Sequence, residues 1–126
     1  MSRRRASSLS PPEFHLLTAW GRDLYETFGS MPYLVGSCVR GEQYRDVDVR
    51  MLLVPEKDPM HCITQPGRKH TLLGLNTAIS VWGQKVTGLP IDFQFQDCET
   101  ANAEHDGLAR NPIGHHGAER FPKDQR

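Results

Sequence analysis

The stretch Asp46-Val47-Asp48-Val49-Arg50-Met51-Leu52-Leu53 alternates between polar and apolar side chains as far as Met51. From Val47 to Leu53 every second residue is apolar, which is the period of two that a β-strand gives to each of its faces. We therefore expect a strand over approximately residues 46–54. One face of this strand would join the core, and the carboxylates of Asp46 and Asp48 would project from the other face.

A helix is predicted upstream of this strand, beginning at Ser10. Serine is a favourable N-cap, Pro11 and Pro12 occupy early positions that need no N–H donor, and Glu13 can complete a capping box. Apolar residues follow at helical spacing, and Gly29 can end the helix. The residues that mark the inner face of this helix are Phe14, Leu17, Trp20 or Gly21, Leu24 and Phe28.

Further segments complete the predicted fold. Residues 33–35 favour a short strand, and residues 55–67, with three prolines and a glycine, favour a loop. A second helix ends near Gly88, and a third strand over residues 91–96 alternates again, with Asp92 on its polar face. The apolar residues that mark these two elements are Leu72, Leu75, Ile79, Trp82 and Val86 in the helix and Ile91, Phe93 and Phe95 in the strand.

The order helix, strand, strand, helix, strand predicts an α+β or α/β fold, in which a small mixed β-sheet carries helices packed on one face. A chain of 126 residues has the size of one domain, which we place at residues 10–98. Residues 1–9 are expected to form a disordered basic tail. Residues 99–126 are a polar extension rich in Gly, His and Pro, for which no element is predicted.

Charge and composition limit the classes of function. Lysine plus arginine and aspartate plus glutamate number 15 each, which disfavours a protein built around bulk attraction to nucleic acid. The three cysteines have no paired spacing and predict no disulfide framework. No apolar run approaches the roughly 18 residues of a membrane span, so we expect a soluble, cytoplasmic protein that does not contact a membrane.

Three carboxylates share the polar phase of two predicted strands. Asp46 and Asp48 are two residues apart, so their side chains emerge on one face with Cα atoms about 6.5–7 Å apart. Asp92 occupies the outward phase of residues 91–96. If the two strands are neighbours, the three carboxylates face one site and could hold Mg²⁺ or Mn²⁺. An Asp-x-Asp pattern also occurs on ordinary solvated strand faces.

A turn at Val35-Gly36-Ser37 follows the first predicted strand. Small residues at such a turn let backbone N–H groups approach phosphate oxygens. Arg40 and Arg45 lie between this turn and Asp46, and each could contact phosphate or could equally be a surface charge. Arg50 is a weaker candidate for the same role.

The Gly-Ser turn, the pair of aspartates and the later aspartate, in this order, resemble the signature of the polymerase-β-type nucleotidyltransferase superfamily. Within that superfamily the chain most resembles the minimal nucleotidyltransferases. That signature is an apolar residue, Gly-Ser, a spacer, then Asp-h-Asp-h (h, apolar), with a third acidic residue on a later strand. The matching residues are Val35-Gly36-Ser37, Asp46-Val47-Asp48-Val49 and Ile91-Asp92-Phe93, and the resemblance spans about residues 13–97. The eight residues between Ser37 and Asp46 form a spacer a little shorter than the family's usual one.

The resemblance implies a catalytic domain over residues 10–98. This domain would transfer a nucleoside monophosphate from ATP or another NTP to a hydroxyl of RNA, protein or a small molecule and release pyrophosphate. Gly36 and Ser37 would bind the β- and γ-phosphates of the nucleotide. Asp46 and Asp48 would ligate Mg²⁺ or Mn²⁺. Asp92 would complete the site as a metal ligand or as the general base. Members of this kind often act with a small helical protein partner.

Two other interpretations stay open. In the first, the nucleotidyltransferase fold survives as a non-catalytic binding or assembly module. In the second, the motif is accidental and the chain is an unrelated small α/β domain. The accidental motif would leave Asp92 far from Asp48 in the folded protein.

Overall fold

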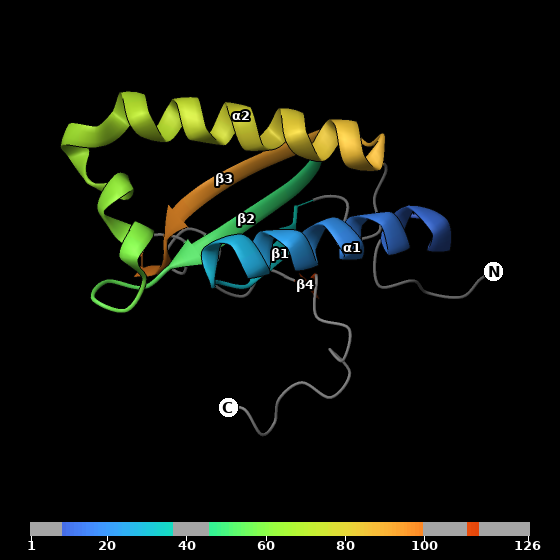
Figure 1. The fold of residues 1–126 in the computed structure, drawn as a ribbon, viewed down its shortest axis with the longest axis horizontal. Coiled ribbons are helices and arrows are strands. Elements are labelled where there is room, and N and C mark those ends of the chain that lie inside the picture. The colour runs from blue at the N-terminus through green and yellow to red at the C-terminus, as the bar shows by residue number, and fades with distance from the viewer. Residues whose placement is uncertain (1–8, 37–45, 100–110, 114–126) are drawn as a thin grey trace, which may run out of the picture.

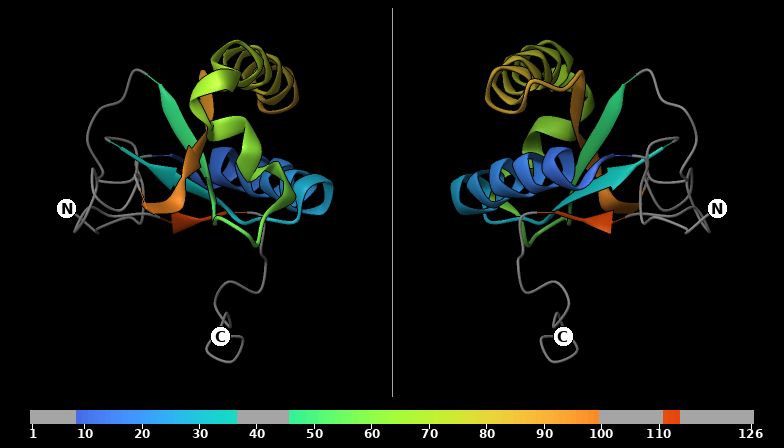
Figure 2. Two further views of the ribbon diagram at one scale, coloured as in Figure 1. Left: turned by 90° about the vertical axis from the view of Figure 1, so that its left-hand side faces the viewer. Right: turned by 90° about the vertical axis from the view of Figure 1, so that its right-hand side faces the viewer.

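The structure is a computed structural model that describes residues 9–36, 46–99 and 111–113. Its strands form one sheet in the order β3-β2-β1-β4, and the two long helices pack against one face of that sheet (Figures 1 and 2). The elements along the chain are α1 (Pro11–Phe28), β1 (Pro32–Val35), β2 (Val47–Leu53), the 3-10 helices η1 (Pro59–Thr64) and η2 (Pro66–Arg68), α2 (Lys69–Thr87), β3 (Ile91–Asp97) and β4 (Asn111–Pro112). This confirms the predicted α+β architecture.

The ends of α1 follow from its sequence. The Ser10 hydroxyl accepts a hydrogen bond from the Glu13 backbone N–H at 3.3 Å, and the Ser10 backbone N–H donates to the Glu13 carboxylate at 2.9 Å. The predicted capping box is therefore confirmed. At the other end Gly29 adopts φ +78°, and its N–H donates to the Tyr25 carbonyl. A residue in this left-handed conformation ends a helix, and glycine adopts it without a steric penalty.

The sheet is mixed, because β1 pairs with β2 in antiparallel fashion and β2 pairs with β3 in parallel fashion. The apolar phase of β2 is fully buried, and the polar phase is half-buried, as the alternation predicts. A crossover through α2 joins β2 to β3, the kind of connection that parallel neighbours require. The buried residues on the inner face of these strands are Leu34, Val47, Val49, Met51, Leu53, Ile91, Phe93 and Phe95.

Trp20 of α1 lies at the centre of the core. Its ring meets Trp82 of α2 edge-on with centroids 5.8 Å apart, and meets Phe93 of β3 edge-on at 6.3 Å. Such edge-to-face pairs add about 0.5–1.5 kcal/mol to the free energy of burial. Trp20 is inaccessible to solvent, so α1, α2 and the sheet share one core around this side chain.

Four details differ from the sequence predictions. Leu9, assigned to the basic tail, is buried in the core, and residues 1–8 lie outside the described part of the chain. Residues 55–67 include η1 and most of η2 rather than only loop. In the C-terminal extension, where no element was predicted, β4 pairs with β1. Val86, predicted to mark the second helix with its apolar stripe, is 45% exposed, and the inner face of α2 instead buries Gly83 and Thr87.

Among the helices of the described residues, none is long and apolar enough to cross a membrane.

Candidate functional site

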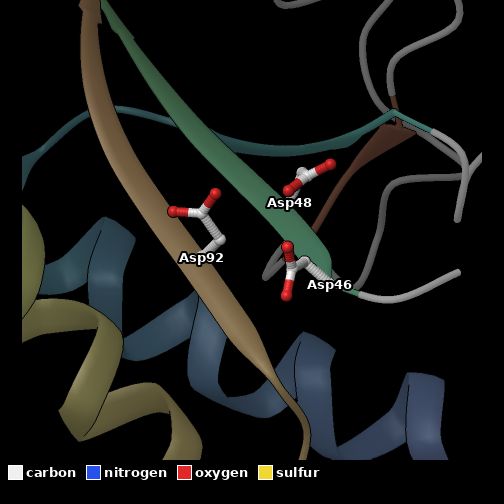
Figure 3. Close-up of side chains that lie close together, drawn as sticks. All are labelled: Asp46, Asp48 and Asp92. Atoms are coloured by element: carbon white, nitrogen blue, oxygen red, sulfur yellow. The ribbon is translucent and has the colours of Figure 1, made fainter.

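The three predicted carboxylates come together at one end of β2 and β3. Asp46 directly precedes β2, and the parallel register places Asp48 opposite Asp92. One carboxylate oxygen from each residue lies within 4.8 Å of the other two (Figure 3). Asp46 is exposed, whereas Asp48 and Asp92 are half-buried. The arrangement that the strand phases predict is therefore present.

This convergence follows from register. In a parallel pair, residues that face each other point to the same side of the sheet. Val47 pairs with Ile91, and Val49 pairs with Phe93, so the residues between them must also pair. Because the apolar partners face the core, Asp48 and Asp92 both project from the opposite face.

Arg50 lies in the same phase of β2 and brings a positive charge to the site. Its guanidinium is 3.9 Å from a carboxylate oxygen of Asp48 and 3.6 Å from one of Asp92. It also donates hydrogen bonds to the backbone carbonyls of Val49, at 3.1 Å, and Asp92, at 2.7 Å. The Arg50 side chain is only 13% exposed, whereas the Asp92 side chain is 42% exposed, so the contact with Asp92 is partly open to water. Arg50 thus partly neutralises two of the three carboxylates.

Gly36 lies on the other side of Asp48, at the end of β1. It has φ +82°, and a Cβ built at this residue would lie 2.5 Å from the Asp48 Oδ2 atom. Only glycine adopts this conformation and leaves this space without strain. The backbone of the turn therefore passes directly beside one of the three carboxylates.

A groove of about 340 Å³ opens on the Asp92 side of the site, between β3 and α2. Asp46 and Asp92 line one end of it. Its α2 wall is formed by Leu73, Thr77 and Val81 together with other uncharged residues. The groove and Gly36 therefore lie on opposite sides of the carboxylates.

Side chains of α2 hold the edge of β3 that faces this groove. Ser80 Oγ accepts a hydrogen bond from the Phe93 N–H at 2.8 Å, and the Gln84 amide donates to the Ile91 carbonyl at 2.9 Å. Asn76 Oδ1 accepts from the Phe95 N–H at 3.0 Å. The backbone on both sides of Asp92 is thereby fixed by α2. The sequence gives only a weak signal for these three hydrogen bonds, namely polar residues that repeat every four positions on one helix.

The predicted site residues divide into two groups. The structure brings Gly36, Asp46, Asp48 and Asp92 together. Ser37, Arg40 and Arg45 lie outside the described residues, so their predicted contacts with phosphate stay predictions. Arg50, considered only as a weak phosphate contact, instead pairs with the carboxylates. Its position in the same strand phase as Asp48 could have indicated this.

Comparisons of the chain with family models, with curated proteins and with solved structures found no match. The resemblance to nucleotidyltransferases therefore rests on the sequence motifs alone.

Proposed function

We propose that this protein is a metal-dependent nucleotidyltransferase that moves a nucleoside monophosphate from an NTP to a hydroxyl of RNA, protein or a small molecule. The observation that carries this proposal is the convergence of Asp46, Asp48 and Asp92 within 4.8 Å, directly beside the Gly36 turn. An accidental motif would have no reason to bring a carboxylate of a later strand into register with Asp48.

The donor set fits Mg²⁺ or Mn²⁺. Both ions prefer carboxylate oxygens, and Asp46, Asp48 and Asp92 supply three such groups at one end of the sheet. Without a cation, two carboxylates about 4 Å apart repel each other by about 4 kcal/mol at an effective dielectric constant of 20. Arg50 offsets only part of this repulsion, since one guanidinium faces both Asp48 and Asp92.

In the proposed reaction the residues of the chain have distinct roles. Asp46 and Asp48 would hold the cation, which when bound would stabilise the charge on the phosphoryl oxygens. The Gly36 backbone would lie against the phosphates, because no side chain stands between it and the site. Asp92, as ligand or general base, would lie nearest to the acceptor hydroxyl and could take its proton.

The alternative function is a non-catalytic nucleotidyltransferase-fold module for binding or assembly. The presence of all three carboxylates disfavours it, because a module without catalysis has no need to maintain their mutual repulsion. A small helical protein partner is compatible with either function.

Label transfer tests the proposal. The protein is incubated with each α-labelled NTP, Mg²⁺ or Mn²⁺, and a lysate that contains RNA, protein and small molecules. We expect label in an acceptor with the wild-type protein and none with the Asp46→Asn/Asp48→Asn double variant. Asp23→Asn, on the exposed surface of α1, is the matched control and should transfer label as the wild type does.

A binding measurement separates the two functions. An enzyme should show a rise in melting temperature with Mn²⁺ that is lost in the Asp48→Asn variant, since ligands that bind the folded state stabilise it. Folded protein that transfers no label with any NTP, and whose melting temperature does not respond to Mn²⁺ and NTP, would show that the catalytic proposal is wrong.

A further inference from the structure

The groove between α2 and β3 lies where an acceptor would have to bind. The strand order β3-β2-β1 places Gly36, at the end of β1, on one side of Asp48, and Asp92 on the other side. The groove begins at Asp46 and Asp92 and extends along α2, away from Gly36. If the nucleotide occupies the Gly36 side, as the proposed function requires, an in-line attack on its α-phosphorus comes from the groove side.

The described residues that line this groove carry negative charge and no positive charge. Its only charged residues are Asp46 and Asp92, and no described residue that lines it is basic. The α2 segment from Thr71 to Gln84 contains no charged residue at all, although Leu73 is 63% and Val81 50% exposed. An acceptor that carries phosphate would therefore find no basic side chain to pair with among the described residues that line the groove.

The uncharged polar side chains of the groove are suited to hydrogen bonds with the hydroxyl groups of a ligand. Asn76, Thr77, Gln84 and Gln94 are uncharged, and their side chains offer both donors and acceptors, as a hydroxyl does. Asn76 uses its oxygen and Gln84 its nitrogen to hold β3. Asn76 Nδ2 and Gln84 Oε1 keep no partner among the described residues, so each can bind a ligand. The exposed Leu73 and Val81 add apolar surface for the carbon skeleton of that ligand.

We propose that the acceptor is a small polyhydroxylated compound without phosphate, such as a sugar or polyol, bound in the groove between α2 and β3. This inference rests on the proposed function and names its substrate class. A volume of about 340 Å³ is near the lower end of the roughly 300–1,000 Å³ of small-molecule sites. That size suits one or two sugar rings.

The reaction at this site balances as follows. A hydroxyl oxygen of the acceptor forms a bond to the α-phosphorus of the NTP. The bond between that phosphorus and the oxygen bridging to the β-phosphate breaks, and pyrophosphate leaves with the electron pair. The hydroxyl proton passes to the Asp92 carboxylate and from there to solvent. The product is a phosphodiester between the nucleoside and the acceptor.

The test offers the acceptor classes separately. RNA, protein and a small-molecule filtrate are prepared from one lysate, and the filtrate is divided by an anion-exchange resin into retained and unretained compounds. Each fraction is incubated with α-labelled NTP, Mn²⁺ and the full-length protein. We expect label to enter compounds of the unretained filtrate. Preferential labelling of RNA, protein or the retained compounds would overturn the acceptor proposal.

Failure of this inference and failure of the proposed function give different results. If the carboxylates support conversion of NTP to NMP and pyrophosphate but no fraction is labelled, the acceptor proposal is wrong and the metal-dependent phosphoryl chemistry stands. If neither reaction occurs with folded protein, the proposed function itself fails.

A charged residue introduced into the groove tests whether the acceptor binds there. Thr77→Lys adds a cation to the lining, so we expect the ratio of retained to unretained labelled acceptors to rise by about tenfold or more. The melting temperature should still rise with Mn²⁺, because the three carboxylates are intact in this variant. Ala78→Lys, which is exposed on the same helix but does not line the groove, is the control and should leave the ratio unchanged. An unchanged ratio with Thr77→Lys would show that the acceptor binds elsewhere.

Discussion

Gly36 and Asp48 are so close that a Cβ at residue 36 would lie 2.5 Å from the Asp48 carboxylate oxygen Oδ2. Gly36 also has φ +82°, a conformation that costs an L-residue about 1–2 kcal/mol. We predict that Gly36→Ala destabilises the fold by about this amount and also displaces Asp48. The expected result is a lower melting temperature together with a loss of Mn²⁺ affinity of tenfold or more, measured by titration calorimetry and converted at about 1.4 kcal/mol per factor of ten.

Gly29 supplies the control for this prediction. It has a similar φ of +78°, but a Cβ there would meet nothing within 4 Å. Gly29→Ala should therefore lower stability by a comparable amount and leave Mn²⁺ affinity unchanged. Equal loss of Mn²⁺ affinity in the two variants would mean that backbone strain, and not contact with Asp48, explains the effect.

Arg50 gives a second prediction. Arg50→Met removes the hydrogen bonds to the Val49 and Asp92 carbonyls and the positive charge between Asp48 and Asp92. We expect a loss of stability of about 2 kcal/mol, in the range for hydrogen bonds to charged groups. Because the carboxylates then repel each other without compensation, Mn²⁺ should raise the melting temperature more in this variant than in the wild type.

The comparison for Arg50 is Arg22, which pairs with Glu26 on the surface of α1 at 3.9 Å. Both side chains are more than half exposed, so this pair contributes about 0.5 kcal/mol or less. Arg22→Met should lower the free energy of unfolding by no more than about 0.5 kcal/mol. It should also leave unchanged the rise in melting temperature that Mn²⁺ causes. A smaller Mn²⁺ response in Arg50→Met than in the wild type would show that Arg50 supports metal binding and does not compete with it.

Local signals account for much of the predicted fold. The capping box at Ser10, the left-handed Gly29 and the alternation of residues 47–53 each depend on neighbours in sequence, and all three are confirmed. The pairing of β4 with β1 joins residues that are far apart in sequence, and a two-residue strand containing Pro112 has no periodicity to detect. The 3-10 helices escaped prediction because proline favours their first turn as readily as it favours a loop.

In the candidate site, too, some features follow from local sequence and others depend on tertiary packing. Strand phase alone predicts which face carries Asp48 and Asp92, and the parallel register then brings them together. The contact between Gly36 and Asp48, by contrast, depends on the exact path of the chain at the end of β1. The bond from Ser80 to the β3 backbone depends on how α2 packs against that strand, which a single sequence does not contain.

A third prediction concerns the edge of β3. Ser80→Ala removes the acceptor for the Phe93 N–H, and an unsatisfied buried N–H costs about 1–3 kcal/mol. Phe93 directly follows Asp92, so we also expect weaker Mn²⁺ binding, by severalfold. Amide exchange at Phe93, measured by NMR, should be faster than in the wild type. The control is Thr77→Ala, which removes a hydroxyl of the same helix that has no bond to another described residue. It should change neither the Mn²⁺ affinity nor the amide exchange at Phe93. A change in either would mean that the general polarity of α2 matters more than the Ser80 hydrogen bond.

The fourth prediction uses two glycines of α2 that differ only in their surroundings. A Cβ at Gly83 would lie 2.6 Å from the Trp20 ring, whereas a Cβ at Gly74 would meet nothing within 4 Å. Alanine is the better helix former by about 1 kcal/mol, so Gly74→Ala should stabilise the protein by roughly that amount in urea unfolding.

At residue 83 the contact with Trp20 outweighs this gain. Trp20 is fully buried and meets Trp82 and Phe93 edge-on, so its ring has little room to move away. Overpacking of such a core costs about 1–3 kcal/mol, and Gly83→Ala should therefore be net destabilising despite its better helix propensity. Smaller residues at position 20 should reverse the sign: in a Trp20→Phe background, Gly83→Ala should become neutral or stabilising. A stabilising effect of Gly83→Ala in the wild-type background would mean that α1 and α2 pack less closely around Trp20 than this structure has them.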